Sequence, residues 1–321
     1  MASALRAAVV GVGYLGRFHA EKYAAHPGVE LVGVVDADEE RARAVAAALG
    51  VEAFGDHRAL QGRVDCASVA VPTVQHFEVA RDLLEANVDV LVEKPVTTTV
   101  EDAKALVELA VKGGRVLQVG HLERFNPAVL ALDGLVTQPR FIECHRLAPF
   151  TERGTDVDVV LDLMIHDLDV ILSMVPSALR SVEAVGVPVL TSSVDIANAR
   201  LRFANGCIAN VTASRVSLKR ERKLRIFQAD AYLAVDYGER RIRVCRREPD
   251  ADGQAALVIE DREVPEGDAL ENEIGSFLRA VREREPPAVS GWDGLRALEV
   301  AQVIRESLET EVRAAHTASG A

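Results

Sequence analysis

Residues 5–20 read LRAAVVGVGYLGRFHA, where an apolar run, Ala7–Val10, leads into a glycine-rich turn and then into helix-forming residues. The turn, Gly11-Val12-Gly13-Tyr14-Leu15-Gly16, has the spacing G-x-G-x-x-G. Gly11 permits a tight turn, Gly13 lets the backbone approach a pyrophosphate, and Gly16 lets the helix pack closely against the strand. The helix N-terminus offers N–H groups and a positive dipole end to phosphate. This pattern predicts a dinucleotide-binding loop that includes Tyr14 and Leu15.

An acidic residue follows this loop at the distance that a dinucleotide-binding fold requires. Asp36 ends the next apolar run, Leu31–Val35, about twenty residues after the glycines. Its carboxylate would accept hydrogen bonds from both ribose hydroxyls and would repel a 2′-phosphate. No arginine stands at the discriminating positions beside Asp36, although Arg41 and Arg43 lie nearby. We therefore expect NAD to be favoured over NADP as the cofactor.

Beyond the loop, apolar runs alternate with amphipathic helical patterns. This alternation predicts a Rossmann-type α/β fold, a doubly wound parallel sheet with helices on both faces. After residue 121, alternating β-branched segments predict a C-terminal α+β domain with a mostly antiparallel, open-faced sheet. We expect two domains, residues 1–121 and 122–321, the C-terminal helices being able to pack back on the first. The expected strands are 7–10, 31–35, 66–71, 88–92, 116–119, 181–187, 196–203, 207–213, 224–228, 232–235 and 242–245, and the expected helices are 15–25, 39–49, 77–86, 101–112, 127–132, 158–175, 270–284 and 295–312.

Composition excludes several classes of protein. The 321 residues carry a formal net charge of −12, which argues against nucleic acid and anionic membranes as partners. No run approaches the ~20 apolar residues of a membrane helix, and no cleavage-site pattern follows the N-terminal apolar stretch. The widely spaced cysteines predict reduced thiols and a cytoplasmic protein; they are Cys66, Cys144, Cys207 and Cys245.

A lysine stands at the carboxyl end of a predicted parallel strand. Glu93-Lys94-Pro95 follows the apolar run Val88–Val92, and Pro95 restricts Lys94 to extended conformations. Ligands of open α/β sheets bind beyond the carboxyl ends of the strands. We therefore predict that Lys94 points into the crevice where a nicotinamide lies. A surface lysine with no role in chemistry is the alternative that the spacing leaves open.

A polar stripe interrupts the apolar helix predicted over residues 158–175. On a continuous helix, Asp162 and His166 are i, i+4 neighbours, with Asp169 on the same face and Asp167 pointing elsewhere. A carboxylate beside an imidazole fixes its tautomer and raises its pKa, which suits a general base. A structural hydrogen-bond network is an alternative explanation. A metal site would need further ligands that the sequence does not indicate, so we expect none.

Together these motifs resemble the glucose-fructose oxidoreductase, inositol dehydrogenase and rhizopine-catabolism (Gfo/Idh/MocA) family. The resemblance implies nicotinamide-dependent chemistry at a sugar or cyclitol hydroxyl, with Lys94, Asp162 and His166 at the catalytic positions. It also implies a homodimer or homotetramer formed through the second sheet. The residues that carry it are Gly11–Gly16, Asp36, Val71-Pro72-Thr73 with His76, Glu93-Lys94-Pro95, and Asp162 with His166.

The same resemblance implies that Pro72, Thr73 and Glu93 lie at the cofactor. His76 is open between a cofactor contact and a capping or packing role. The chain departs from the family pattern beside Asp162, since Val159-Val160-Leu161 and Leu163-Met164-Ile165 stand where many members have glycines. This departure puts a broad sugar specificity in doubt.

Two longer segments, Val119–Pro127 and Asp162–Asp169, resemble a bacterial subgroup that oxidises UDP-N-acetylglucosamine at C3. A UDP-sugar needs cations for its diphosphate, and we expect substrate contacts from Arg124, Asn126, Arg146 and Arg153 in addition to the catalytic residues. Oxidation of a free sugar or inositol is one alternative. A non-catalytic NAD-binding regulator is another, disfavoured because Lys94 and His166 are both present.

Overall fold

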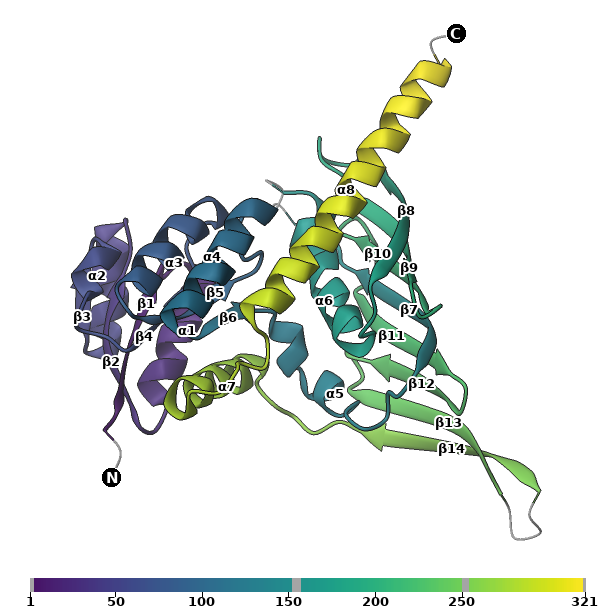
Figure 1. Cartoon of the computed structure of the whole chain (residues 1–321), viewed down its shortest axis with the longest axis horizontal. Coiled ribbons are helices and arrows are strands. Elements are labelled where there is room, and N and C mark those ends of the chain that lie inside the picture. Colours follow the sequence, from purple (N-terminus) through teal and green to yellow (C-terminus); the bar gives the residue numbers. More distant parts are fainter. Residues whose placement is uncertain (1–2, 152–156, 250–253, 320–321) are drawn as a thin grey trace. The chain divides into compact units, whose positions relative to one another are not determined.

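The chain folds into two units, each with its own sheet (Figure 1). The structure is a computed structural model that describes residues 3–151, 157–249 and 254–319. Unit 1 consists of Met1–Phe125 and Asp268–Leu298, and unit 2 of Asn126–Gly267 and Glu299–Ala321. No helix in the described part of the chain combines the length and apolar character that crossing a bilayer needs.

Unit 1 contains a six-stranded sheet in the order β3-β2-β1-β4-β5-β6, in which every pair is parallel. The chain builds the sheet from β1 outward to β3 at one edge, and then from β4 outward to β6 at the other edge. Right-handed crossovers then put α1 and α2 on one face and α3 and α4 on the other. The elements are β1 (Leu5–Val10), α1 (Tyr14–Ala25), β2 (Val29–Val35), α2 (Glu39–Leu49), β3 (Glu52–Phe54), β4 (Cys66–Val69), α3 (His76–Glu85), β5 (Asp89–Glu93), α4 (Val100–Gly113), β6 (Leu117–Gly120) and α7 (Ala269–Glu283), while α8 (Gly291–Ser319) contributes to both units.

The strands of unit 1 are apolar because both faces of the sheet are covered. Every residue of β4 and β5 is buried, and the core continues from β1 through α1 to Ile274 and Phe277 of α7. Side chains cap several helices at their first turns: Asp38 accepts a hydrogen bond from Arg41 N, and Thr99 accepts one from Asp102 N. Such caps stabilise a helix by about 1 kcal/mol each.

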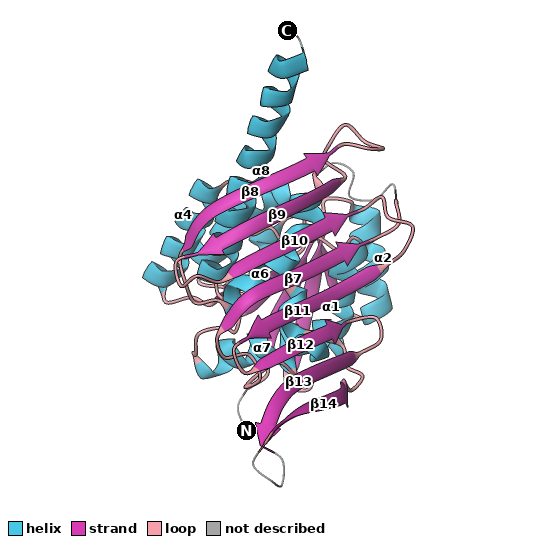
Figure 2. Cartoon of the chain, turned by 90° about the vertical axis from the view of Figure 1, so that its right-hand side faces the viewer, coloured by secondary structure: helices cyan, strands magenta, loops and turns pink. Residues whose placement is uncertain are grey.

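Unit 2 contains an eight-stranded sheet in the order β14-β13-β12-β11-β7-β10-β9-β8. Among the described strands of this sheet, only β7 and β10 pair in parallel. Figure 2 shows the strands side by side with α6 behind them. The elements are α5 (Pro127–Leu130), β7 (Pro139–Leu147), α6 (Ile165–Met174), β8 (Leu179–Val187), β9 (Ile196–Phe203), β10 (Ile208–Ser214), β11 (Glu221–Gln228), β12 (Ala231–Asp236), β13 (Arg241–Pro249) and β14 (Ala255–Glu263).

The predicted fold class is confirmed, but three strands were not predicted: β3, β7 and β14. The strand β3 has only three residues. The strand β14 alternates between exposed and half-buried residues with none fully buried, so it lacks an apolar signature. The inward-facing positions of β7 include a charged residue, Arg146, which breaks the expected alternation.

The helix predicted over residues 158–175 also differs between the prediction and the structure. Residues Val160–Met164 form a π-helical turn, in which Ile165 N bonds to Val160 O, and α6 begins only at Ile165. A π-turn adds a residue to the helical repeat and shifts every side chain that follows. The prediction of one continuous α-helix through Asp162 and His166 is therefore wrong.

Candidate active site

The glycine-rich loop joins β1 to α1 as predicted, and two of its glycines are required by the protein itself. Gly11 has φ of 85°, and a Cβ there would lie 2.7 Å from the backbone of Ala70. A Cβ at Gly16 would lie 1.8 Å from the Gly11 carbonyl oxygen. A Cβ at Gly13, in contrast, would meet nothing in the described chain within 4 Å. Packing within the described chain therefore does not explain this glycine, and the open space is what close approach of a pyrophosphate would require.

The first turn of α1 begins directly after Gly13 of the glycine-rich loop. Gly13 is the N-cap residue, and no side chain caps the helix. The first N–H groups of a helix lack intrahelical partners and carry the positive end of its dipole. Tyr14 is two-thirds exposed at this turn and packs edge-on against Phe18. These features fit the phosphates of a dinucleotide.

The Asp36 carboxylate lies where β2 ends and faces the loop. Oδ2 accepts a hydrogen bond from Val12 N at 3.0 Å, and Oδ1 accepts one from Asp38 N at 2.9 Å. Arg41 Nη1 lies 3.3 Å from both oxygens. Asp36 therefore shapes the loop and presents an acceptor beside it, with a cation close by.

The loops after β4 and β5 are tied together by His76. Its Nδ1 lies 2.8 Å from the carbonyl oxygen of Pro95, and its Nε2 lies 2.9 Å from that of Val71. The ring is 1% exposed, and burial lowers its pKa. Both nitrogens face backbone carbonyls, so the side chain links the Pro72-Thr73 loop to the Lys94-Pro95 turn.

Lys94 follows β5 and is half-buried. Its neighbour Glu93 pairs with Gly120 of β6, so His121 comes next to the lysine turn. His121 is 1% exposed; burial, followed by the charges of Lys94 and Arg124, lowers the pKa of its imidazole to about 3. Unit 1 thus gathers the glycine loop, Asp36, Pro72-Thr73 and Lys94 at the carboxyl ends of adjacent parallel strands.

In unit 2, Asp162 lies in the π-helical turn and His166 in the first turn of α6, both half-buried. Asp158 stabilises this turn, since its Oδ1 accepts hydrogen bonds from Val160 N at 3.0 Å and Leu161 N at 3.1 Å. A carboxylate and an imidazole in a largely apolar helix are suited to holding and moving a proton.

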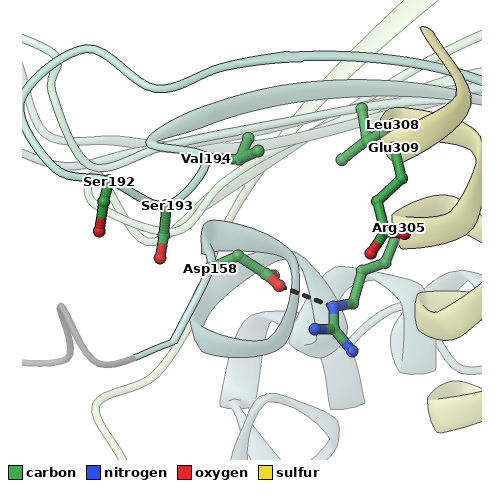
Figure 3. Close-up of a pocket in the computed structure, with 7 residues that line it drawn as sticks. All are labelled: Asp158, Ser192, Ser193, Val194, Arg305, Leu308 and Glu309. Carbon is green, nitrogen blue, oxygen red and sulfur yellow. Dashed lines mark hydrogen bonds and ion pairs between the residues drawn. The ribbon is translucent and has the colours of Figure 1, made fainter. Parts of the chain in front are cut away.

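Arg305 of α8 holds Asp158 from the other side. Its Nε lies 2.7 Å from Asp158 Oδ2, at the wall of a pocket of about 330 Å³ (Figure 3). The pocket lies beside the turn that carries Asp162. It is lined by Asp158, Ser192, Ser193, Val194, Arg305, Leu308 and Glu309.

The residues predicted to contact the substrate have varied surroundings. Arg146 is buried and makes a bidentate pair with Asp167, at 2.8 Å from Nε and 2.7 Å from Nη2. Arg124 Nη2 donates to Ala288 O at 3.3 Å. The Asn126 side chain accepts a hydrogen bond from Ala128 N at 2.9 Å and so caps α5. Arg153 lies outside the described residues.

Two buried histidines near Lys94 were not predicted as functional. His121 was noted only as part of the segment Val119–Pro127 that resembles a subgroup of the family. Its position directly after an apolar strand is a signal that could have identified it as a candidate site residue. His19 gave no signal, because a single histidine in a helix has many ordinary explanations. In the described chain, His19, Glu93 and Glu273 place possible ligand atoms within 4.8 Å of one another. Both ring nitrogens of His19 have hydrogen-bond partners, Ser68 and Glu93, so we interpret this group as a hydrogen-bond network.

Family models match both units of the chain. Residues 5–121 match a family model described as an oxidoreductase family with an NAD-binding Rossmann fold, and residues 129–234 match the GFO/IDH/MocA C-terminal domain. The UDP-N-acetylglucosamine 3-dehydrogenase of Acidithiobacillus ferrooxidans is 40% identical over 95% of this chain and 97% of its own. Its solved structure superposes with a TM-score of 0.90 over 96% of this chain and 99% of that one. The myo-inositol 2-dehydrogenase of Thermotoga maritima is 26% identical over 95% of this chain and 96% of its own.

Proposed function

This chain belongs to the Gfo/Idh/MocA family of oxidoreductases, and we propose that it oxidises a secondary hydroxyl group of a sugar nucleotide with NAD. The observation that carries the proposal is the 40% identity, over nearly the full length of both chains, to a UDP-N-acetylglucosamine 3-dehydrogenase. The substrate we propose is UDP-N-acetylglucosamine, oxidised at C3. The inositol dehydrogenase relative is more distant, at 26% identity, so oxidation of a cyclitol or free sugar is the second candidate.

Three side chains of this protein carry the proposed chemistry. His166 accepts the proton of the hydroxyl group, while Asp162 orients the imidazole and stabilises its charged form. Lys94 donates a hydrogen bond to the same oxygen and stabilises the negative charge that develops there. NAD, when bound, would supply the hydride acceptor. The hydroxyl group thus gives its proton to His166, and loss of a hydride from the same carbon, with NAD bound, would leave a ketone.

The cofactor proposal is NAD in preference to NADP. Gly13 leaves space for the pyrophosphate, and the uncapped first turn of α1 offers it N–H groups. The carboxylate of Asp36 supports NAD because it would bind the ribose hydroxyls and repel a 2′-phosphate. Pro72, Thr73 and Glu93 complete the proposed cofactor environment.

The diphosphate of the substrate requires cations, for which we propose Arg124, Arg146 and Arg153, with Asn126 as a polar contact. Arg146 already has two nitrogens bound to Asp167. Its contribution therefore includes holding Asp167, the residue that directly follows His166 in α6.

The assembly proposal is a homodimer or homotetramer formed through the sheet of unit 2. Its face opposite α6 carries a cluster of half-buried aromatic rings, Phe141, Phe227 and Tyr232. We also propose a cytoplasmic location, supported by the four free cysteines.

The substrate proposal is tested by following NAD reduction with UDP-N-acetylglucosamine, other UDP-sugars, free sugars and inositols. Turnover with UDP-N-acetylglucosamine, together with identification of a 3-keto product, supports the proposal. Faster turnover of an inositol would replace it with the second candidate, and NAD binding without turnover of any of these would favour a regulator.

The catalytic assignment is tested by Lys94→Ala and His166→Ala. Each variant should lower kcat by ~10²-fold or more while leaving NAD affinity nearly unchanged, because each side chain acts on the reacting oxygen. The matched controls are Lys104→Ala, an exposed lysine of α4, and His57→Ala, which lies in the turn 57–60. Wild-type turnover in both Lys94→Ala and His166→Ala would remove the assignment.

A further inference from the structure

A line of buried polar side chains runs through unit 1 from α1 to the lysine turn. The Tyr23 hydroxyl of α1 lies 2.8 Å from Ser68 Oγ of β4, which lies 3.1 Å from His19 Nδ1. His19 Nε2 lies 3.1 Å from Glu93 Oε1 at the end of β5. The exposed fraction is 0% for Tyr23, Ser68 and His19, and 8% for Glu93. Buried polar groups are costly, so such a line calls for a reason.

One arrangement of protons satisfies the whole line. If Glu93 is a carboxylate, His19 Nε2 must carry the proton that it donates, and Nδ1 of a neutral ring must then accept. Ser68 donates its only proton to that Nδ1, so Tyr23 must donate to Ser68 Oγ. Burial raises the pKa of Tyr23, which keeps this first donor protonated. Every donor in the line therefore points toward Glu93.

Glu93 connects this line to the residue that follows it. Its Oε2 accepts a hydrogen bond from the Lys94 backbone N at 3.3 Å. On β6, a Cβ at Gly120 would lie 2.8 Å from Glu93 Oε1, so glycine makes room for the carboxylate. On the other side of the turn, His76 bonds to the Pro95 carbonyl. Lys94 thus lies between Glu93 and Pro95, and each of these two neighbours contacts a buried histidine, His19 or His76.

We propose that His19 is a positioning residue for Lys94, acting through the Glu93 carboxylate. The proposal rests on the catalytic role assigned to Lys94 above. A flexible lysine side chain reaches one oxygen atom accurately only if its backbone is fixed, and a displacement of 1 Å can cost about 10²-fold in rate. Tyr23 and Ser68 serve the same purpose by fixing the tautomer of His19.

The test compares two substitutions that each keep half of the imidazole. Glutamine places an amide N–H near the position of Nε2, whereas asparagine reaches only the position of Nδ1. We expect His19→Asn to lower kcat by roughly tenfold to hundredfold and His19→Gln by about threefold at most, with Kd for NAD nearly unchanged in both. His57→Asn, which alters a histidine paired with Asp82 elsewhere in unit 1, is the matched control and should keep wild-type turnover.

Repeating both substitutions in a Lys94→Ala background separates positioning from general destabilisation. If His19 acts through Lys94, His19→Asn should change kcat no further in that background. An equal loss of kcat in both backgrounds, or equal losses in His19→Gln and His19→Asn, would overturn the proposal while leaving the role of Lys94 intact. Wild-type kcat in Lys94→Ala alone would overturn the catalytic role of Lys94 and this proposal with it.

Should His19→Asn fail to fold, Tyr23→Phe provides the same test with a smaller change. It removes only the hydroxyl group that donates to Ser68. We expect about a threefold loss of kcat that disappears in the Lys94→Ala background. No loss of kcat, or a loss that persists in that background, would contradict the proposal.

Discussion

At the scale of single residues, Asp36 combines a structural role with a proposed role in binding the cofactor, and a sequence motif cannot separate the two. Its carboxylate accepts hydrogen bonds from the backbone at Val12 and Asp38, and it lies beside Arg41. The backbone contacts shape the loop, while binding of the ribose is the role that we propose for the remaining acceptor capacity. Without the carboxylate, Arg41 Nη1 would lose its contacts to Asp36, while Arg41 Nη2 would keep its bond to Asp38 Oδ2.

Replacing Asp36 with alanine tests the cofactor preference. We expect kcat/KM with NAD to fall by about tenfold to hundredfold, since charge-assisted hydrogen bonds are lost. The NADP:NAD ratio of kcat/KM should rise, because repulsion of the 2′-phosphate disappears and Arg41 Nη1 no longer pairs with Asp36. Steady-state kinetics with both cofactors measures this, with Glu39→Ala as the control. An unchanged ratio would contradict the assignment.

His121 should make the free energy of unfolding depend on pH. Its pKa in the folded protein is lowered to about 3, against an ordinary value of about 6.5 in the unfolded chain. Between these values the unfolded state binds more protons, so the free energy of unfolding should decrease as pH falls, by about 1.4 kcal/mol per pH unit. Above pH ~6.5 this contribution is constant.

The test measures the free energy of unfolding of the wild type and of His121→Gln by urea titration. The titrations are repeated between pH 4 and pH 6 in steps of about one pH unit. The variant should have a shallower decrease of stability on acidification. A part of the decrease should remain, because burial also lowers the pKa of His76. Equal slopes in the two proteins would show that His121 is not the group responsible.

At the scale of elements, α6 and β7 are joined by a buried ion pair. Arg146 occupies an inward-facing position of β7 and binds both carboxylate oxygens of Asp167 on α6. Both residues are at most 4% exposed. The pair thereby fixes α6 on the sheet, one residue after His166. Removing one partner leaves a buried charge without compensation.

Arg146→Met and Asp167→Leu should each reduce stability by about 3–5 kcal/mol. This corresponds to a decrease in Tm of roughly 10 °C. The double variant should recover much of the loss, because a well-packed apolar pair can replace a buried ion pair. Thermal unfolding of the three variants measures it, and a double variant less stable than either single one would contradict this explanation.

At the scale of the whole molecule, the sheet of unit 2 has one face that no helix among the described residues of this unit covers (Figure 2). Phe141, Phe227 and Tyr232 cluster there, with ring centroids 5.6 Å and 4.7 Å apart. The strands β7, β11 and β12 bring these rings together through their register. An aromatic cluster on a sheet face is typical of a surface that associates.

Phe227→Lys should therefore dissociate the proposed oligomer, since a charge placed in an apolar interface is strongly unfavourable. Sedimentation velocity at several protein concentrations measures the change in mass. Leu218→Lys, at a fully exposed position, serves as the control and should leave the assembly intact. A wild-type protein that sediments as a monomer would exclude the proposed assembly.

The prediction of the first sheet succeeded because its signals are local. Strands buried on both faces are apolar throughout, as in β4 and β5, and Gly11 and Gly16 mark the one turn that requires them. The candidate cofactor residues follow from this topology, because parallel strands bring their carboxyl ends to one edge of the sheet.

Other features depend on contacts between residues far apart in the chain. Arg146 occupies an inward-facing position of β7, where Asp167 neutralises it, so an alternation rule could not identify this strand. The π-helical turn before α6 depends on its surroundings and shifts the register of Asp162 and His166. The line from Tyr23 to Glu93 joins three elements, and its members have no common sequence pattern.

The amino-acid sequence by itself thus determined the two kinds of sheet, the glycine loop and the family. These features depend on backbone conformation and burial patterns, which residues close together in the sequence specify. Only the tertiary structure decided which buried charges and hydroxyls pair. Those pairs are selected by the free energy of satisfying polar groups away from water, and that free energy depends on which distant residues the fold brings together.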